Sequence, residues 1–262
     1  MTDPIALCAE GEAAWHRFAY DSLGSGWADD GRLARAADTV PHPFLLGAVT
    51  LTPDATVPDE VPGIVCDSYA RLSLPGRRAE PTGHWMVRSG GAAAPVSSVP
   101  GLSIRRAETD DDVVWFEAVA FLAADGTPPS RIGELHPAGS QRQPGVTLLV
   151  AEIDGEGVGT ALSIVTPRVN NIGAVAVMAA QRGRGIGSLL TEAAAAVAPE
   201  VTATLSATPL GRGVYARLGF TEVGRPLHVQ HTGTVEHCKA PHPAQFILQC
   251  LGNTGTDPGD EH

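Results

Sequence analysis

The 262-residue chain has little of several features that mark particular classes of protein. It contains a single lysine, Lys239, and its 18 basic residues are outnumbered by 29 acidic ones, which gives a formal net charge of −11. Nucleic acids and anionic membranes are bound mainly through Lys and Arg that neutralise phosphates. The acidic balance therefore predicts no nucleic-acid partner and no membrane partner, and it mildly favours cationic ligands.

Long hydrophobic runs are also missing. No apolar segment approaches the roughly 18 residues that span a bilayer, and the opening stretch MTDPIALCAEGEAAW carries acids where a secretory leader carries basic residues. The four cysteines, Cys8, Cys66, Cys238 and Cys250, lie far apart and form no CxxC pair. We therefore expect reduced structural thiols rather than a disulfide framework, and the predicted location is the cytoplasm.

Composition along the chain predicts two parts of unequal size. Residues 1–90 are predicted to form a small α/β domain. Small residues and prolines at 91–100 cannot build a packed element and predict a linker. Residues 101–250 are predicted to form the main domain, and the polar tail 251–262 is expected to be flexible.

Within the first part, apolar positions at helical spacing predict a helix at 5–20, and residues 64–74 are also predicted to be helical. Residues 43–51 and 84–88 are short apolar runs beside turn residues, which predicts two strands. These elements together predict an α/β unit.

The main domain begins with a short predicted strand and a helix that Thr109 is positioned to cap. Residues 146–166 contain two apolar runs joined at Asp154-Gly155-Glu156-Gly157, a sequence typical of a hairpin. The strand GAVAV follows, and it leads directly into a glycine-rich stretch.

That stretch, MAAQRGRGIGSLLTEAAAAVA at 178–198, places three glycines between a strand and a helix. Such a turn aims several unpaired backbone N–H groups at one point, and the helix dipole adds positive character, which is suited to phosphate. Gly183, Gly185 and Gly187 leave room for close approach, and Arg182 and Arg184 add charge. The alternative is an ordinary loop in which the glycines only turn the chain.

Two nucleotide-binding motifs fit this stretch poorly. The dinucleotide pattern GxGxxG requires glycine at position 188, which is Ser188, and no acidic residue closes a strand about 20 residues later. The pattern GxxxxGK[ST] is absent because no lysine follows these glycines.

The pattern RxxGxG is satisfied by Arg182, Gly185 and Gly187, and TPLGRGVYARLGF follows about 20 residues later. With both motifs in this order, the chain resembles the GCN5-related N-acetyltransferase (GNAT) superfamily over roughly residues 101–235. The resemblance implies an α/β (α+β) fold, with a mixed, mostly antiparallel sheet flanked by helices, preceded here by the smaller α/β domain. Residues 1–90 are interpreted as a degenerate acetyltransferase-like half, with the first 100 residues acting as a noncatalytic lid or interface domain.

The resemblance also implies acetyl-CoA as co-substrate. Backbone groups of the strand would hold the pantetheine arm, the glycine turn would hold the pyrophosphate, and Val177 would donate its N–H to the oxyanion. Tyr215 falls on the position of the family's general acid, which protonates the departing thiolate. The cofactor-binding residues implied in this way are Val175, Ala176, Val177, Arg182, Gly183, Arg184, Gly185, Ile186, Gly187, Ser188 and Thr208.

One family feature is missing, because the predicted strand VTATLSAT carries no acid to deprotonate the acceptor. Glu117, Glu134, Glu152 and His136 are substitutes from other elements, and each is expected to be a solvated surface residue. No general base is assigned from the sequence.

Several histidines and cysteines follow the second motif but match no compact zinc pattern, so no metal is predicted. These residues are His228, His231, His237, Cys238, His242 and Cys250.

The leading interpretation is an acetyl-CoA-dependent N-acetyltransferase that acts directly on a primary amine of a small molecule or peptide, and the acidic composition favours a cationic acceptor. Two alternatives stay open: a catalytically degenerate acyl-CoA-binding regulatory module, and an O-acyltransferase on the same scaffold. A homo-oligomer is compatible with the sequence.

Overall fold

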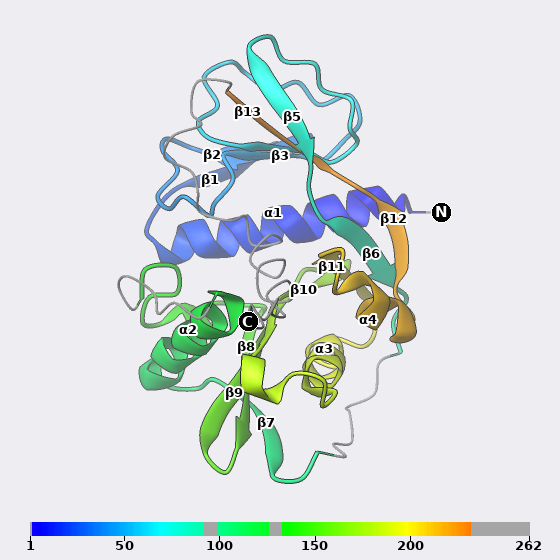
Figure 1. The fold of residues 1–262 in the computed structure, drawn as a ribbon. Coiled ribbons are helices and arrows are strands. Elements are labelled where there is room, and N and C mark those ends of the chain that lie inside the picture. Colours follow the sequence, from blue (N-terminus) through cyan, green and yellow to red (C-terminus); the bar gives the residue numbers. More distant parts are fainter. Residues whose placement is uncertain (1, 92–98, 126–132, 232–262) are drawn as a thin grey trace, which may run out of the picture.

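The computed structural model describes residues 2–91, 99–125 and 133–231, and it consists of two β-sheets with a long helix between them (Figure 1). The predictions for most of the linker and for the tail lie outside these residues. The helices are α1 (Pro4–Ser22), α2 (Asp110–Asp125), α3 (Ile186–Ala195) and α4 (Arg212–Arg217), with short 3-10 turns η1 (Ser140–Arg142) and η2 (Ala179–Gln181). No helix in this part of the chain is long and apolar enough to cross a membrane.

The strands of the first half are β1 (Trp27–Asp29), β2 (Leu33–Ala36), β3 (Ala48–Thr50), β4 (Val65–Asp67), β5 (Arg77–Pro81) and β6 (His84–Arg88). Those of the second half are β7 (Leu102–Arg106), β8 (Val146–Ile153), β9 (Glu156–Val165), β10 (Val169–Val177), β11 (Thr202–Ala207), β12 (Thr221–Gly224) and β13 (Leu227–His231). The hairpin predicted at Asp154-Gly155 is confirmed, since β8 and β9 pair antiparallel across it.

Local capping explains where the two long helices begin. Asp3 accepts a hydrogen bond from the Ile5 N–H at 3.0 Å at the start of α1, so the helix predicted at 5–20 is confirmed with slightly wider bounds. Before α2, the Thr109 hydroxyl accepts from the Asp112 N–H at 3.1 Å, and the Asp112 carboxylate accepts from the Thr109 N–H at 2.9 Å. This reciprocal arrangement confirms the predicted cap.

The helix predicted at 64–74 is wrong. Residues 65–67 form the fully buried strand β4, which lies between β3 and β13, and turns follow it. Asp67 ends the strand by accepting hydrogen bonds from the N–H groups of Tyr69 and Leu72. Pairing on both sides of the strand therefore overrides the helical spacing of the apolar residues.

The strand orders of the two sheets are equivalent when the six-stranded sheet is read from β5 to β1. The seven-stranded sheet has the order β12-β6-β11-β10-β9-β8-β7, and the six-stranded sheet has the order β5-β13-β4-β3-β2-β1. In both, a parallel pair, β11/β10 or β4/β3, has antiparallel neighbours. Strand β6 comes from the first half but lies between β11 and β12, and β13 comes from the second half but lies between β4 and β5. Each half therefore donates one strand to the sheet of the other, and the predicted ranges 1–90 and 101–250 do not each hold a complete sheet.

Arg88 at the end of β6 shows how tightly the donated strand is held. Its guanidinium forms an ion pair with Glu192 of α3 at 2.6 Å and donates to the Leu218 carbonyl at 2.9 Å. The same group lies 4.8 Å from the ring centre of Phe220. A residue of the first half thus fastens the helix and the turn that border the seven-stranded sheet.

Helix α1 fills the space between the sheets (Figure 1). Ala9 packs into the core with the six-stranded sheet, whereas Phe18 packs with Phe116 of α2 and with the seven-stranded sheet. A Cβ on Gly11 would lie 2.6 Å from Thr204 Oγ1. Glycine at this position therefore allows the helix to approach β11 closely.

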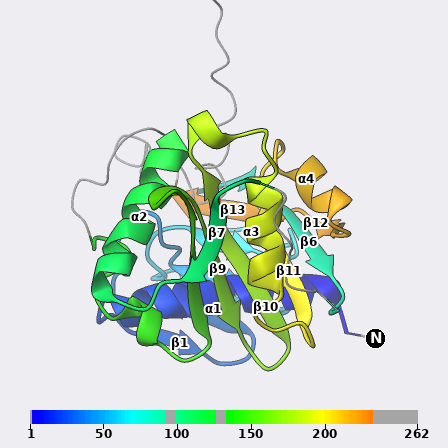
Figure 2. The same cartoon turned by 90° about the horizontal axis from the view of Figure 1, so that it is seen from below.

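Helices α2 and α3 cover opposite faces of the seven-stranded sheet and lie on either side of β9 in Figure 2. Alternation along β8 explains this, because Leu148 and Val150 pack with α2 while Leu149 and Ala151 pack with α3. The α/β fold with a mostly antiparallel sheet flanked by helices is confirmed.

Candidate active site

Strands β10 and β11 separate along their length. Their parallel pairing runs only from Val169 to Ile172 on β10, and β11 then continues beside β6 up to Ala207. A bulge between Gly173 and Ala176 bends β10 away from β11. Beyond Ile172, β10 therefore pairs, among the described strands, on its β9 side only.

The backbone of this segment faces its two sides alternately. The Thr160 hydroxyl donates to the Ala174 carbonyl at 2.9 Å, and the Met178 N–H donates to the Val158 carbonyl at 2.9 Å, both on β9. Because successive peptide groups of a strand alternate in direction, the backbone N–H and carbonyl groups of Val175 and Val177 point to the unpaired side. An extended ligand placed there would meet these groups as an added strand.

The glycine stretch closes the end of this opening. Gly183 has φ +78° and Gly185 has φ +85°, backbone conformations that glycine adopts without strain. Gly185 is the N-cap of α3, so the N–H groups of Ile186, Gly187 and Ser188 lie in the first turn, where helices have no carbonyl partner for them. The turn therefore offers the anion cradle expected from the sequence.

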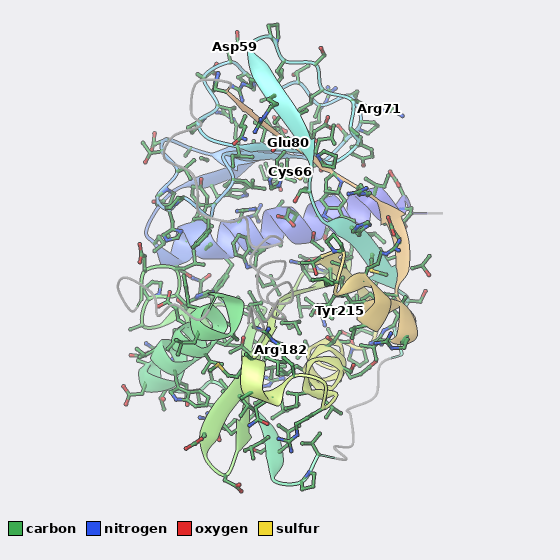
Figure 3. The ribbon with its side chains drawn as sticks, in the orientation of Figure 1. Asp59, Cys66, Arg71, Glu80, Arg182 and Tyr215 are labelled. Atoms are coloured by element: carbon green, nitrogen blue, oxygen red, sulfur yellow. The ribbon has the colours of Figure 1, made fainter. Side chains whose placement is uncertain are left out.

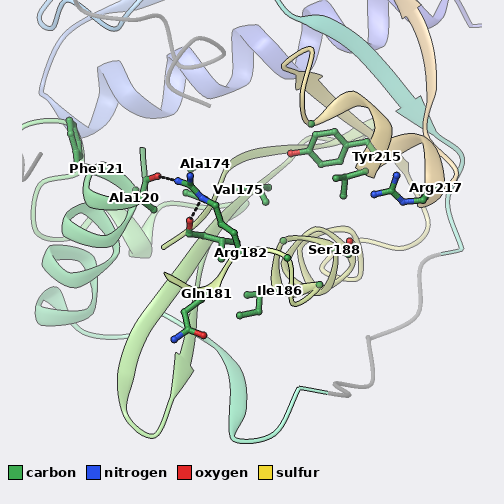
Figure 4. Close-up of a pocket in the computed structure, with 18 of the residues that line it drawn as sticks. Ala120, Phe121, Ala174, Val175, Gln181, Arg182, Ile186, Ser188, Tyr215 and Arg217 are labelled. Atoms are coloured by element: carbon green, nitrogen blue, oxygen red, sulfur yellow. Dashed lines mark hydrogen bonds between the residues drawn. The ribbon is translucent and has the colours of Figure 1, made fainter. Parts of the chain in front are cut away.

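Arg182 braces the turn. Its Nε donates to the Val177 carbonyl at 3.1 Å and its Nη2 donates to the Ala123 carbonyl at the end of α2 at 2.8 Å (Figure 4). These bonds tie α2, β10 and the turn together. Arg184 is exposed and donates to the Gln181 side chain.

A cavity of about 450 Å³ occupies the opening (Figure 4). Nine of the residues implied by the resemblance line it: Val175, Ala176, Val177, Arg182, Gly183, Gly185, Ile186, Gly187 and Ser188. Tyr215 lines it as well. The other lining residues are Trp15, Phe44, Ala120, Phe121, Ala123, Leu135, His136, Ala174, Gln181, Gly211, Val214 and Arg217.

Tyr215 is positioned by α4 and by its aromatic neighbour Phe220, whose ring centre is 6.1 Å away in an edge-on arrangement. Its hydroxyl points away from α4 toward the centre of the pocket in Figure 4. Figure 3 places Tyr215 and Arg182 in the half of the molecule that contains the seven-stranded sheet, away from Cys66 in the other sheet. Burial raises the pKa of Tyr215 to about 12, so the hydroxyl stays protonated at neutral pH.

Two of the implied residues do not line the cavity. Thr208 is fully buried, and its hydroxyl accepts a hydrogen bond from the Gly211 N–H at 2.9 Å, which shapes the turn into α4. Arg184 is not among the residues that line the cavity. Cofactor contacts of these two residues stay predictions.

The surface location expected for Glu117 and His136 is wrong. Glu117 has no exposed surface, and His136 is 5% exposed and lines the cavity. The chain after α2 folds back so that its backbone N–H groups bond to the Glu117 carboxylate, which offsets the cost of burying it. Glu134 and Glu152 are partly exposed, and neither lines the cavity.

Sequence reasoning missed the walls contributed by α1 and by the loop before β3. Trp15 and Phe44 come from the first half of the chain, and they face the cavity together with Phe121 of α2. No local pattern separates these side chains from ordinary core aromatics, since only the packing of α1 between the sheets brings them here. Arg217 also lines the cavity, and its place two residues after Tyr215 is the one signal that could have identified it.

The residues present fit acetyl-CoA. The unpaired side of β10 suits the amides of a pantetheine arm, the first turn of α3 suits a pyrophosphate, and Arg217 adds a cation at the cavity wall. Within the described residues, no group of three or more His, Cys, Asp or Glu could hold a metal ion.

Comparison with known proteins agrees with this geometry. Residues 144–222 match the family described as the acetyltransferase (GNAT) domain, which confirms over this part of the chain the resemblance seen in the sequence. A search of curated proteins gives no match.

Two solved structures share the fold over most of the chain. A GCN5-related N-acetyltransferase from Kribbella flavida is 19% identical, with 87% of this chain and 96% of that chain covered and a TM-score of 0.60. A functionally unknown conserved protein from Staphylococcus epidermidis is 15% identical, with 82% and 98% covered and a TM-score of 0.57. At these identities the likeness concerns the fold, and it extends over both halves of the chain.

Proposed function

We propose that the protein is an acetyl-CoA-dependent N-acetyltransferase that moves an acetyl group directly to a primary amine, with Tyr215 as general acid. The observation that carries this proposal is the opening between β10 and β11. It brings an unpaired strand edge, a glycine turn at a helix N-terminus and the Tyr215 hydroxyl to one cavity.

In this reaction a neutral amine attacks the thioester carbonyl, and the backbone N–H of Val177 stabilises the oxyanion. The Val177 carbonyl is already bonded to Arg182, which fixes the peptide at the end of β10. Tyr215 then protonates the departing thiolate, and its raised pKa keeps that proton available across the neutral range.

The acceptor end of the cavity is apolar. Trp15, Phe44, Phe121 and Leu135 line it, and none of the described lining residues is acidic. We therefore propose an amine that carries an apolar substituent. The cationic acceptor expected from composition rests on the net charge of the chain, and no carboxylate is among the described residues that line this cavity.

The experiment is calorimetric titration with acetyl-CoA, followed by detection of free thiol with 2-phenylethylamine, spermidine, an aminoglycoside and the alcohol 2-phenylethanol. Turnover with an amine supports the proposal. Binding of acetyl-CoA without thiol release on any amine or alcohol would favour the acyl-CoA-binding regulatory module, an alternative suggested by the lack of an acid on strand β11. Thiol release on alcohols alone would favour the O-acyltransferase.

We further propose that the protein is cytoplasmic, that it has no nucleic-acid or membrane partner, and that a homo-oligomer is an allowed state. The strand order shared by the two sheets supports the interpretation of residues 1–90 as a diverged acetyltransferase-like half.

A further inference from the structure

The proposed transfer leaves one proton without an acceptor. An amine reaches the cavity mainly as its ammonium form at neutral pH, so a proton must leave before the nitrogen can attack. Strand β11 carries no acid, and no described lining residue is a carboxylate. His136 lines the cavity, and a neutral imidazole has one nitrogen that can accept a proton.

His136 lies against a carboxylate that is held in place. Glu117 Oε1 accepts hydrogen bonds from the N–H groups of Leu135 at 2.8 Å and His136 at 3.0 Å, and Oε2 accepts from the Gly133 N–H. Burial acts to raise the pKa of Glu117, but these bonds and the neighbouring imidazole outweigh it, and the pKa lies below its ordinary value. Glu117 is therefore a fixed negative charge at neutral pH.

The position of this charge selects one tautomer of the imidazole. Within the described part of the chain, His136 Nδ1 is buried without a hydrogen-bond partner, and Glu117 Oε1 lies 3.7 Å from it. A lone pair on Nδ1 would face the carboxylate lone pairs, so the proton of the neutral ring belongs on Nδ1. The other nitrogen, Nε2, then carries the lone pair and is free to accept a proton.

We propose that His136 is the general base of the reaction and that Glu117 is the positioning residue that fixes its tautomer. This proposal rests on the proposed amine acetylation. His136 Nε2 takes one proton from the ammonium group, and the neutral amine then forms the C–N bond. When the C–S bond breaks, Tyr215 gives its proton to the thiolate and regains one from the nitrogen of the new amide. The remaining proton leaves from His136 to solvent, so one proton is released per acetyl group transferred.

Several groups surround the His136 ring. Phe18 of α1 and Phe116 of α2 pack against it with ring centres 6.0 and 5.3 Å away. Glu117 supplies the adjacent charge, and His42, paired with Glu134 at 3.5 Å, lies close enough to interact with both Glu117 and His136 electrostatically. His42 does not line the cavity, which makes it a matched control.

The test compares pH profiles of kcat/KM for 2-phenylethylamine in the wild type, His136→Asn and His42→Asn. The asparagine amide at 136 can still donate toward Glu117 but has nothing in place of Nε2. In the wild type, the pH profile of kcat/KM should contain a level region, because His136 takes the proton from the bound ammonium form. In His136→Asn, kcat/KM should be roughly 10²-fold lower at pH 7.5, and it should keep rising tenfold per pH unit because only the free amine reacts. His42→Asn should keep the wild-type shape.

If the pH profile of kcat/KM for His136→Asn also becomes level, the assignment of His136 as the base would be overturned, while the proposed function would stay intact. Absence of thiol release from the wild type with every amine would overturn both. The positioning role has its own measurement, which needs no turnover. Nitrogen NMR of the wild type should show the Nδ1-protonated tautomer for His136, and Glu117→Gln should shift the ring toward the other tautomer. An unchanged tautomer in a folded Glu117→Gln protein would refute the role of Glu117.

Discussion

Tyr215→Phe tests the general acid with little disturbance of the structure. The ring packs against Phe220 and borders Gly211, where an added Cβ would lie 3.1 Å from Tyr215 Cε2. Phenylalanine keeps both contacts. The hydroxyl points into the cavity and makes no hydrogen bond to the described residues. Its removal leaves no buried group unpaired, so the free energy of unfolding should change by less than about 0.5 kcal/mol.

The chemical step should slow much more. General acids contribute roughly 10² or more to the rate, and a 10²-fold loss corresponds to about 2.7 kcal/mol of transition-state stabilisation. Because the pKa of Tyr215 is about 12, only about one molecule in a thousand is ionised at pH 9. The wild-type rate should therefore not fall between pH 7 and 9 through loss of this proton.

Single-turnover kinetics with preloaded acetyl-CoA isolates the transfer step from product release. Calorimetry should give an acetyl-CoA affinity within about twofold of the wild type, since the proposed contacts of the cofactor are with β10 and α3. A Phe variant that transfers at full speed would refute the role of the hydroxyl and leave Tyr215 as a packing residue.

The remaining predictions concern the cofactor and the exchanged strands. Gly187→Ala places a methyl group 3.6 Å from Val177 Cγ2 without backbone strain. Calorimetry should show that the variant binds acetyl-CoA about tenfold more weakly, and its melting temperature should be no lower than that of the wild type. The control variant Gly213→Ala on α4 should bind acetyl-CoA with unchanged affinity. Arg217→Gln should weaken acetyl-CoA binding about threefold at low salt and less at high salt. Arg212→Gln should not weaken it, because the Arg212 side chain pairs with Glu222 at 3.1 Å. Equal losses of affinity in both variants would contradict a contact between Arg217 and a phosphate of acetyl-CoA. A fragment that begins at Gly101 should fail to fold, because it lacks β6 and α1, and a cooperative thermal transition in that fragment would disprove this.

Local sequence rules were sufficient wherever an element is defined by its own residues. The cap at Thr109, the hairpin at Asp154-Gly155 and the glycine turn before α3 each carry their signal within a few positions, and the structure has all three. The GNAT motifs belong to the same class, since the turn and the tyrosine helix are contiguous pieces of chain.

Features that depend on distant partners were beyond such rules. Residues 65–67 have helical spacing but form a strand because β3 and β13 lie on either side of them, and β13 comes from more than 150 residues further along the chain. The burial of Glu117 depends on a loop that returns to it. A single acid within the apolar run VVWFEAVAF at 113–121 gives no sign that backbone N–H groups will surround it.

The strand exchange explains why the proposed acceptor end of the cavity draws on both halves. Donating β6 to the seven-stranded sheet and receiving β13 in the six-stranded sheet holds the two sheets around α1. Trp15 of α1 and Phe44 of the following loop are thereby fixed against α2 and the Leu135–His136 segment. The cofactor side, by contrast, is built from β10, α3 and α4 of the second half alone. On the proposed function, the first half would act on the choice of acceptor through the wall that it supplies, and acetyl-CoA recognition would stay with the GNAT motifs. This division would give the first half a role in the reaction without a catalytic residue of its own.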